Sequence, residues 1–342
     1  MECIGSPLQI KNHKLMIRVT VLVAVYNAEP FLPACLDSLL NQTMTDIQVV
    51  CVDDGSTDGS LSVLRQYAVR DERIEVYSFD SNHGQAYARN VALSHARGDL
   101  VCFLDADDWF SPDALQSAVS EADAHDDADC VLFDVQYEYA DGHAESYPMP
   151  SFESLTGEDA FRMSLDWQIH GIYLVRTKLH QEYPYDDSCH SFSDDNTTRL
   201  HFLASRSVSR CQGMYHYRQH AASVTYAISV RRFDLLRANE SMKRQLQQMN
   251  ANEEVMRRWE TQRLLTLVDL YMFYHCHAHE LPYADRIYGR NELHRVWGTI
   301  ERRLVEHSIS RKFGYCLMPQ WWMFRAEEWL YFTLRGLMGK NK

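Results

Sequence analysis

Four short apolar runs recur through the first third of the chain. Each is nearly uninterrupted and is followed by polar or glycine-containing positions, a pattern typical of strands that are buried in a parallel sheet. We therefore predict four buried strands, at Val19–Val25, Ile47–Val52, Ile74–Phe79 and Leu100–Leu104.

Between these runs, apolar residues recur at helical spacing. Leu32, Leu36 and Leu39 repeat every three to four positions, and Gly84–Ala96 is rich in alanine. The segment 111–113, Ser-Pro-Asp, has the composition of a helix start, with an N-cap residue, a proline at the first position and an early carboxylate. Strands that alternate with helices predict an α/β fold, with a mostly parallel sheet covered by helices on both faces.

The pattern changes twice further along the chain. Asp129–Tyr147 alternates as an extended segment, and Thr156–Asp159 resembles a helix-capping box. Beyond Ser229 the chain has helical periodicity almost throughout. We expect an α/β unit at 16–228, with a first half at about 16–125 and a second half at about 126–228, and then a helical C-terminal region at 229–342.

The overall charge narrows the classes of function. The formal net charge is −13, and 46% of the residues are hydrophobic, which is the composition of an acidic globular protein. Non-specific nucleic-acid binding depends on Lys and Arg that neutralise phosphates, so this chain is a poor candidate for it. To bind a phosphorylated small molecule, the protein would need a metal ion or helix N-termini.

Cysteine usage and the chain start indicate a compartment. The nine cysteines form no C-x-x-C pair, and several, such as Cys51 and Cys102, lie inside apolar runs, as small buried hydrophobes do in a reducing compartment. No apolar stretch approaches the roughly 18 residues of a membrane span. Residues 1–15 lack the apolar core of a secretory signal. We expect a cytoplasmic protein whose residues 1–15 are a disordered extension or a misassigned start.

Acidic residues gather where the predicted strands end. Asp53 and Asp54 follow the second strand, and Asp105 and Asp107 follow the fourth. Ligands of open α/β sheets bind beyond the carboxyl ends of the strands. Because residues i and i+2 of an extended chain point the same way, Asp105 and Asp107 can address one cation, and Mg²⁺ or Mn²⁺ suits such oxygen ligands. Taken singly, each acidic pair would also suit a turn or a helix cap.

Several stretches together resemble a known family. These stretches are Val21–Asn27, Ser38–Thr43, Val52–Asp58, Asn82–Asn90 and Phe103–Asp108. Through them, Val19–Pro112 is similar to the glycosyltransferases of family 2, which have the fold called GT-A, and a weaker similarity extends through Ser193–Asn196 and Tyr215–Arg218.

The resemblance implies that 16–228 is a catalytic unit, with a nucleotide-binding half at about 16–125 and an acceptor half at about 126–228. It also implies a role for each matching residue. Asp54 would accept a hydrogen bond from the base of the donor nucleotide, which favours a UDP-sugar because uracil offers an imide N–H. Asp105 would lie near the ribose and the metal, and Asp107 would ligate the metal, Mn²⁺ or Mg²⁺, directly. The other residues expected near the donor are Ala24, Tyr26, Asn27 and Arg89. The sequence also allows Arg89 to be an ordinary arginine at the surface or the core edge.

The acceptor base of this family is the Asp of a Glu-Asp pair at a helix start. Here the pair is Asp194-Asp195, a departure from the family pattern, and the resemblance implies that Asp195 is the catalytic base. The alternative is structural: Ser193 would cap the helix, and both carboxylates would only favour its first turn.

The family is inverting, so the expected reaction is a single displacement at the anomeric carbon. The expected acceptor is a saccharide or a lipid-linked saccharide, in bacterial surface-polysaccharide synthesis. A sugar nucleotidyltransferase or a dinucleotide oxidoreductase would need a glycine-rich loop after the first strand, and Tyr26–Glu29 has no glycine. A non-catalytic sugar-nucleotide-binding module stays open, because the base motif departs from the family pattern.

Two C-terminal features are separate from this chemistry. We interpret His275, His277 and His279 as part of a partly buried helix face, since no H-E-x-x-H pattern occurs. Residues 311–342 hold six Lys or Arg and two Glu around the aromatic run Trp321–Arg325, which suits peripheral contact with an anionic membrane. Their apolar residues point to nearly all sides of a helical wheel, so a buried packing helix or a homo-oligomer interface is an equal alternative.

Overall fold

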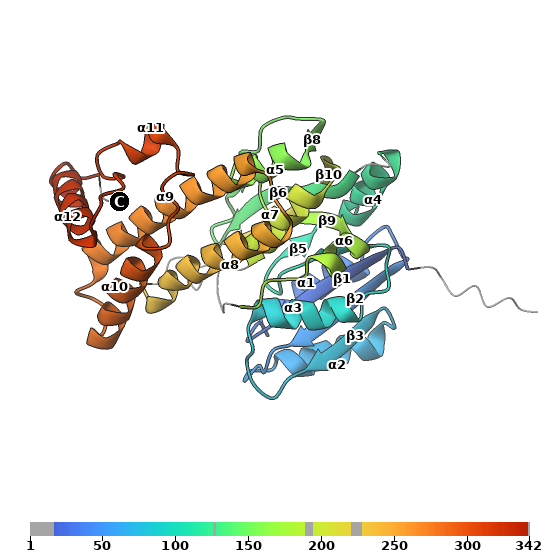
Figure 1. Ribbon diagram of the computed structural model, residues 1–342. Coiled ribbons are helices and arrows are strands. Elements are labelled where there is room, and N and C mark those ends of the chain that lie inside the picture. The colour runs from blue at the N-terminus through green and yellow to red at the C-terminus, as the bar shows by residue number, and fades with distance from the viewer. Residues whose placement is uncertain (1–16, 126–127, 189–193, 220–227, 341–342) are drawn as a thin grey trace, which may run out of the picture.

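An α/β unit and a helical unit make up the protein (Figure 1). This computed structural model describes residues 17–125, 128–188, 194–219 and 228–340. The expected N-terminal extension at residues 1–15 and the expected cap Ser193 lie outside the described residues.

Within the described residues, ten strands form a single sheet. They are β1 (Val19–Val25), β2 (Ile47–Asp53), β3 (Ile74–Ser78), β4 (Leu100–Phe103), β5 (Trp109–Phe110), β6 (Ala128–Tyr139), β7 (Ala144–Ser146), β8 (Ser154–Thr156), β9 (Tyr173–Arg176) and β10 (Ser207–Gln219). Their order is β3-β2-β1-β4-β9-β6-β10-β5, with β7 paired to β6 and β8 to β10. The four strands predicted from the first third are parallel neighbours, whereas β9 runs antiparallel to both β4 and β6.

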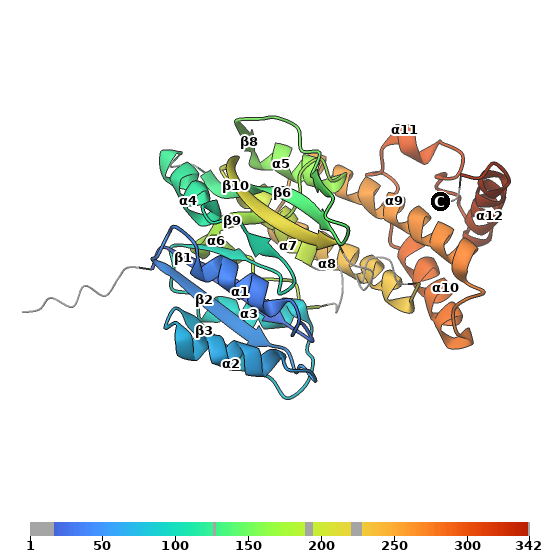
Figure 2. The ribbon, with the colours of Figure 1, turned by 180° about the vertical axis from the view of Figure 1, so that it is seen from behind.

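Helices cover both faces of this sheet, which confirms the predicted fold class (Figures 1 and 2). Val21 and Val23 of β1 pack on the first face, while Leu22 packs on the second. Because both faces are buried, the run is apolar at every position rather than at alternate ones. The first face is covered by α1 (Leu32–Leu40), α2 (Ser60–Arg70) and α4 (Ala114–Ala124), and the second by α3 (Gln85–Ser94), α5 (Gly157–Leu165), α6 (Thr177–Glu182) and α7 (Asp194–Ala204).

The two predicted helix starts had different outcomes. Thr156 caps α5, since its side chain accepts a hydrogen bond from the Asp159 N–H at 3.2 Å, as the capping-box pattern predicts. Helix α4 begins only at Ala114, later than the composition of segment 111–113 predicts. The reason is that Ser111 is bound to β10 instead: its N–H donates to the Met214 carbonyl at 2.9 Å, and its hydroxyl accepts from the Met214 N–H at 3.1 Å.

The helical unit shares a core with the α/β unit. Phe161 of α5 and Leu200 of α7 lie in one apolar cluster with Met242 and Trp259 of the C-terminal helices. The predicted boundary near residue 228 stays a prediction, and the two units are joined by packed side chains. The C-terminal elements are the 3₁₀ helix η2 (Val230–Phe233), α8 (Asp234–Gln248), α9 (Glu253–His277), α10 (Tyr283–Trp297), α11 (His307–Ser310) and α12 (Trp321–Leu337).

The described cysteines are free thiols, and most are buried. Cys51 and Cys102 lie in the core on either side of β1, which confirms that they pack as small hydrophobes, and burial raises the pKa of Cys51 to about 12. Cys3 and Cys189 lie outside the described residues. None of the helices in the described segments combines the length and the apolar character that crossing a bilayer requires.

Candidate donor and acceptor site

Three neighbouring strands bring the predicted donor residues to one edge of the sheet. In the parallel register, Val25 of β1 lies opposite Asp53 of β2, and Leu22 of β1 lies opposite Phe103 of β4. The chain therefore leaves all three strands at the same edge. The residues that follow the strands there are Tyr26 and Asn27, Asp54, and Asp105 to Asp108.

Asp54 is buried and holds the N-terminus of α3. Its side-chain oxygens accept hydrogen bonds from the His83 N–H at 2.7 Å and the Gly84 N–H at 2.8 Å, where a carboxylate is favoured by the helix dipole. Gly55 follows at a φ of 72°, and a Cβ there would lie 2.5 Å from the Ser81 carbonyl carbon. An ionised carboxylate has about four acceptor positions, so these two bonds leave room for a bond from a nucleobase.

Asn27 joins the loop after β1 to the loop after β2. It has a φ of 50°, in the left-handed region that Asn tolerates better than most residues. Its Oδ1 accepts from the Thr57 N–H at 2.8 Å, and its own N–H donates to the Ser56 hydroxyl at 3.0 Å. Tyr26 beside it is about half exposed, and Ala24 is half-buried, so the ring of Tyr26 is accessible to a ligand at this edge.

Arg89 is a buried partner of Asp105, not an ordinary surface arginine. Its Nη2 donates to Asp105 Oδ1 at 2.6 Å, and its guanidinium lies 4.1 Å from the centre of the Phe103 ring. Gln85, one turn earlier on α3, donates to the same carboxylate oxygen at 3.0 Å. Helix α3 thus fixes the orientation of Asp105 from the second face of the sheet.

Asp105, Asp107 and Asp108 form an acidic run after β4, and the sequence alone indicated no role for Asp108. It is buried, accepts from the Tyr215 hydroxyl at 2.7 Å and from the Arg218 N–H at 2.7 Å, and so ties the end of β10 to the loop after β4. Desolvation, with the charges of Asp105 and Asp107, raises the pKa of Asp108 to about 8. The only sequence signal for this connection is the weaker resemblance around Tyr215–Arg218.

Arg218 brings positive charge to the acidic run. Its Nε donates to the Asp107 carbonyl at 2.8 Å, and its guanidinium lies 4.7 Å from the centre of the Trp109 ring and 5.4 Å from that of Phe31. The two ring contacts fix the guanidinium of Arg218 beside these carboxylates. The loop between β4 and β5 is therefore held by β10 on one side and by α3 on the other.

A divalent cation fits the acidic run only if the substrate completes its coordination. In the described part of the chain, no group of three or more His, Cys, Asp or Glu side chains could hold a metal ion. Asp105 and Asp107 offer two hard oxygen donors in a loop that also contains Asp108, and a cation would offset the charge of such clustered carboxylates. Mg²⁺ sites of one or two carboxylates plus substrate phosphates have this composition.

Asp195 lies in the first turn of α7, as predicted. It faces Arg199 one turn later, with 3.9 Å between Oδ2 and Nη2, and its side chain is partly exposed. Asp194 also begins this helix, but its side chain lies outside the described residues. The position of Asp195 suits both the catalytic and the structural alternative.

A chain of hydrogen bonds connects the start of α7 to α3. Asn90 of α3 exchanges two hydrogen bonds with the backbone of Tyr185, each 2.8 Å long. The next residue, Asp186, accepts from Asn196 Nδ2 at 3.0 Å, and its N–H donates to the Thr197 hydroxyl at 3.1 Å. Because Arg89 precedes Asn90 and Asp195 precedes Asn196, these bonds link the helix that orients Asp105 to the helix that carries the predicted base.

Trp167 is a further candidate that was not predicted from the sequence. It lines a small cavity together with Asp195 and His170, its side chain is about half exposed, and its φ is 60°. A bulky aromatic residue at positive φ is a strained outlier, and such strain concentrates at functional sites. Its carbonyl accepts a hydrogen bond from the Tyr147 hydroxyl. No local sequence signal marks such a residue, because its backbone conformation is imposed by the surrounding structure.

His170 beside it is neutral. Burial lowers the pKa of His170 to about 4, and its Nδ1 accepts from the Ile172 N–H at 3.2 Å. The C-terminal histidines contact other groups: His275 lies against the Phe332 ring, and His277 Nδ1 is 2.8 Å from Glu280 Oε1.

Comparison with known proteins decides the family. The family described as Glycosyl transferase family 2 matches residues 20–181. EpsH of Bacillus subtilis (strain 168), described as a putative glycosyltransferase, is 32% identical over 262 residues, which are 71% of this chain and 73% of EpsH. The chain belongs to glycosyltransferase family 2.

Two further similarities bear on this glycosyltransferase. TuaG of B. subtilis (strain 168), described as a putative teichuronic acid biosynthesis glycosyltransferase, is 42% identical over 98 residues, which are 29% of this chain and 39% of TuaG. The crystal structure of S. aureus TarS 1–349 in complex with UDP-GlcNAc has a TM-score of 0.72 at 19% identity, covering 94% of this chain and 92% of that chain. The second likeness confirms the expected GT-A fold with its helical C-terminal region, while the residue roles stay predictions.

Proposed function

We propose that this glycosyltransferase transfers a sugar, with inversion, from a UDP-sugar to a saccharide or lipid-linked saccharide acceptor during surface-polysaccharide synthesis. The observation that carries the proposal is the connection from Asp105 through Arg89 and Tyr185 to the start of α7. It supports a donor pocket and a catalytic base that keep one geometry, which a displacement between two bound substrates requires.

The donor side rests on the three strand ends. Asp54 would accept the imide N–H of uracil while it keeps its two backbone bonds, and Tyr26 would lie beside the nucleotide. The TarS structure named above was solved with UDP-GlcNAc, and this supports uridine as the nucleoside. Arg89 would act by orienting Asp105 from its buried position.

On the acceptor side, Asp195 would take the proton. The acceptor oxygen forms a bond to the anomeric carbon as the bond from that carbon to the diphosphate breaks, and the hydroxyl proton passes to the Asp195 carboxylate. The products are the inverted glycoside and UDP. A positioned base typically contributes about 10²–10⁴-fold to such a step.

Metal dependence is part of the proposal. Asp107 and Asp105 would hold Mn²⁺ or Mg²⁺ together with the diphosphate, and the cation would act as a Lewis acid that stabilises the leaving group. The two carboxylates follow β4 directly, and Arg218 holds the backbone of Asp107 in place.

The name of TuaG supports a cell-surface polymer as the product. For a lipid-linked acceptor, the enzyme would work beside the cytoplasmic face of the plasma membrane.

The loop after β1 argues against a nucleotidyltransferase. Such an enzyme needs free backbone N–H groups to bind a triphosphate. Here the N–H groups of Asn27, Ala28 and Glu29 donate to the side chains of Ser56, Ser60 and Asp58, at 3.0, 2.9 and 3.1 Å. A non-catalytic binding module remains the alternative, and an experiment must distinguish it from an active transferase.

A thermal-shift screen tests donor and metal together. UDP-sugars, GDP-sugars and UDP are each added with Mn²⁺ or with EDTA, and a ligand at 100 times its Kd adds about 2.7 kcal/mol of stability. We expect stabilisation by UDP-sugars in Mn²⁺, weaker stabilisation in EDTA, and loss of the difference in Asp107→Asn. The proposal fails if no UDP-sugar stabilises the protein.

An assay of UDP release separates enzyme from binding module. Release that requires acceptor and Mn²⁺ supports transfer, whereas binding without release with any saccharide or lipid-linked acceptor supports the module. Full activity in EDTA would remove the metal from the proposal.

A further inference from the structure

Helix α12 has an inward and an outward face, which the helical wheel of the sequence did not separate. Phe324 and Phe332 are buried in the core of the helical unit, and Phe324 packs against Tyr271 of α9 and Trp297 of α10. The opposite side is apolar as well, which is why the wheel appears apolar all round. Its members, Trp322, Ala326, Trp329, Leu330, Thr333 and Leu337, follow helical spacing within an arc of about 100°.

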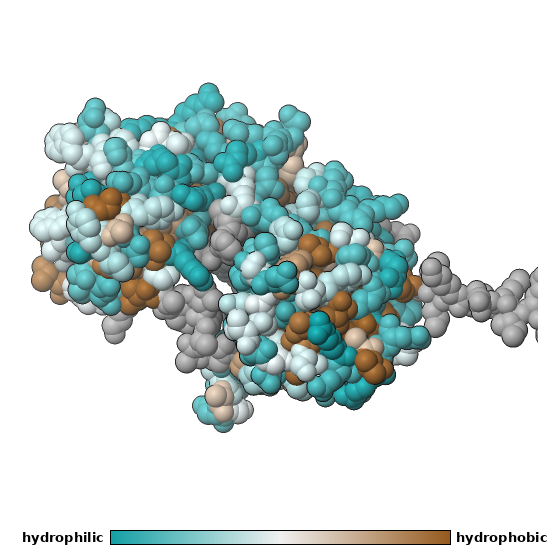
Figure 3. Space-filling model, turned by 90° about the horizontal axis from the view of Figure 1, so that it is seen from below, coloured by the Kyte–Doolittle hydropathy of each residue, from teal (hydrophilic) through white to brown (hydrophobic). Residues whose placement is uncertain are grey.

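This outward face is exposed and contains no charged side chain. Trp322 is 68% exposed, Trp329 58% and Leu337 82%. Single exposed apolar residues are normal, but a continuous stripe with two tryptophans marks a surface for a protein or a membrane. Seen from below, apolar residues reach the surface at the outer edge of the helical unit, on the left in Figure 3.

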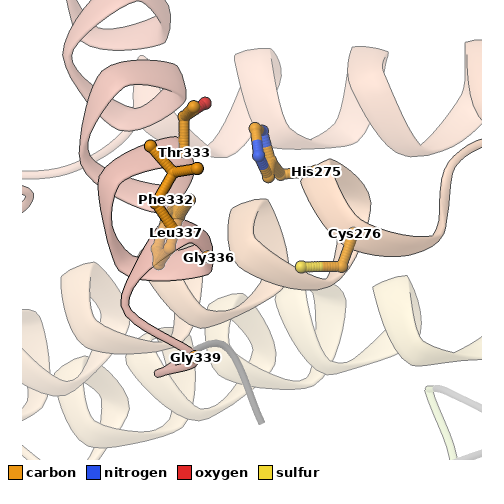
Figure 4. Close-up of a pocket in the computed structure, with 7 residues that line it drawn as sticks. All are labelled: His275, Cys276, Phe332, Thr333, Gly336, Leu337 and Gly339. Atoms are coloured by element: carbon orange, nitrogen blue, oxygen red, sulfur yellow. The ribbon is translucent and has the colours of Figure 1, made fainter.

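A hollow extends this face toward α9. It has a volume of about 610 Å³ and is open to solvent, and its walls are Phe332, Thr333 and Leu337 of α12 with His275 and Cys276 of α9 (Figure 4). The outward face is thus continuous with a recess into which a flexible apolar group can enter.

Within residues 311–340, the exposed charged side chains are all positive, while the exposed carboxylate of Asp269 on α9 lies near Arg335. The acidic residues of 311–340 are Glu327 and Glu328, and both are buried. Glu327 accepts from the Gly314 N–H at 3.1 Å, and burial next to Glu327 raises the pKa of Glu328 to about 9, so that it is neutral at pH 7. The exposed charged side chains of this segment are Arg311, Lys312, Arg325 and Lys340, in a protein whose formal net charge is −13.

We propose that the outward face of α12 docks this protein on an anionic lipid bilayer. Trp322, Trp329 and Leu337 would enter the interface between headgroups and acyl chains, where tryptophan is enriched, and the surrounding cations would face the anionic headgroups. A second copy of this chain is a poorer occupant, because it would bring an identical set of cations against the first. Docking would hold the active site near acceptors carried on lipids, but the surface is separate from the donor and acceptor residues.

Vesicle flotation with the full chain tests the proposal. We expect binding to vesicles of phosphatidylcholine and phosphatidylglycerol, weaker binding in high salt, and little binding to phosphatidylcholine alone. The double variant Trp322→Ser, Trp329→Ser should bind the anionic vesicles roughly ten-fold less, since both rings are mostly exposed and their contribution is to the bilayer. The double variant Arg311→Gln, Lys312→Gln should reduce the part of vesicle binding that high salt also removes.

A matched control comes from the α/β unit. Val69 of α2 is 89% exposed and lies outside this face, so Val69→Ser should leave vesicle binding unchanged. An unchanged Tm shows that each variant is folded, and unchanged UDP release with a soluble acceptor shows that the effect is confined to docking. If that release is absent in every variant and in the wild type, the proposed transfer fails, while the vesicle result still stands.

Three outcomes would overturn the proposal. The first is equal flotation of wild type and double variant, and the second is no flotation of wild type with either vesicle. The third is a dimer of the wild type that dissociates in the double variant without any vesicle binding, which would make the face an interface between two copies.

Discussion

At the scale of single residues, Asp195 is the group to test for proton transfer. A helix N-terminus favours the ionised carboxylate, and Asp195 lies in the first turn of α7 with its side chain partly exposed. Asp195→Asn keeps the shape but cannot accept the proton, so we expect kcat to fall by a factor of roughly 10² or more, with donor binding almost unchanged. Steady-state kinetics and the UDP-sugar thermal shift measure the two effects.

Asp194→Asn is the matched control, because it removes a carboxylate from the same helix turn. It should lower kcat far less. Near-normal kcat in Asp195→Asn would assign the base elsewhere, and a lower Tm in both variants without a specific loss of kcat would support the structural alternative.

Trp167 offers a second test at this scale, on the acceptor side. An aromatic ring beside the predicted base suits a sugar ring, and the φ of 60° costs roughly 1–3 kcal/mol, which the surrounding structure must offset. Trp167→Gly removes the ring and relieves the strain, whereas Trp167→Ala removes the ring and keeps the strain. We expect both variants to raise the acceptor KM several-fold with an unchanged donor KM, and Trp167→Gly to have the higher Tm.

An unchanged acceptor KM with a lower stability would show that the Trp167 ring has only a packing role. If both variants keep the acceptor KM and lose stability through the lost contact with Arg199, whose guanidinium lies 5.5 Å from the ring centre, Trp167 has no part in the site.

Local motifs find some site residues and miss others for a physical reason. Asp54, Asp105 and Asp107 directly follow buried strands, and the edge where those strands end follows from the parallel pattern alone. The bond between Asp108 and Tyr215 joins positions 107 residues apart, and the strained backbone of Trp167 depends on tertiary packing. No periodicity or spacing within either segment encodes such contacts.

At the scale of elements, β1 was predicted to the residue, whereas α4 starts later than its composition suggests. The strand is determined by its own apolar run, which is buried on both faces. The start of the helix depends on a distant segment, because the backbone of Ser111 hydrogen-bonds to β10, a strand about 100 positions away, instead of joining the helix. The antiparallel insertion of β9 between β4 and β6 is equally non-local.

Helix α12 has a stability cost that depends on pH. Both side-chain oxygens of Glu328 are buried and lack a hydrogen-bond partner in the described part of the chain, and desolvation with the charge of Glu327 raises the pKa of Glu328 to about 9. The folded state therefore binds this proton more tightly than the unfolded state. Its stabilising effect is complete below about pH 4.5, the ordinary value, and is lost as the pH rises toward about 9.

Glu328→Gln carries the neutral form permanently. We expect the wild-type Tm to fall relative to that of the variant between these two pH values, by a few degrees. Parallel Tm profiles for the two proteins would show that Glu328 is not the source of the pH dependence. Glu327→Ala should instead lower the Tm at all pH values, because it removes the side-chain oxygen that accepts from the Gly314 N–H.

At the scale of the whole molecule, the two units differ in charge. An acidic α/β unit concentrates carboxylates at one sheet edge, and the helical unit carries the cations that surround α12. The sequence predicted two such units and a basic, aromatic end. It could not predict that α8 and α9 share a core with α5 and α7, since that cluster joins residues from both sides of the expected boundary.

Because of this shared core, we expect each unit to depend on the other for stability. Truncation of the chain tests this dependence. A chain that ends at residue 228 would expose Phe161 and Leu200, which are fully buried in the whole protein, and would lose Met242 and Trp259 as their partners. Each such loss resembles a large-to-small core substitution, worth about 2–5 kcal/mol, against a total stability of about 5–15 kcal/mol. We therefore expect the truncated chain to aggregate or to melt far below the full chain, and not to bind a UDP-sugar. In the full chain, Trp259→Ala should lower the free energy of unfolding by about 3–5 kcal/mol while the secondary structure is kept, because the same cluster is weakened without removing any helix. A truncated chain that stays monomeric, melts near the full chain and still binds the donor would show instead that the α/β unit folds alone and that the cluster is a surface contact between independent domains.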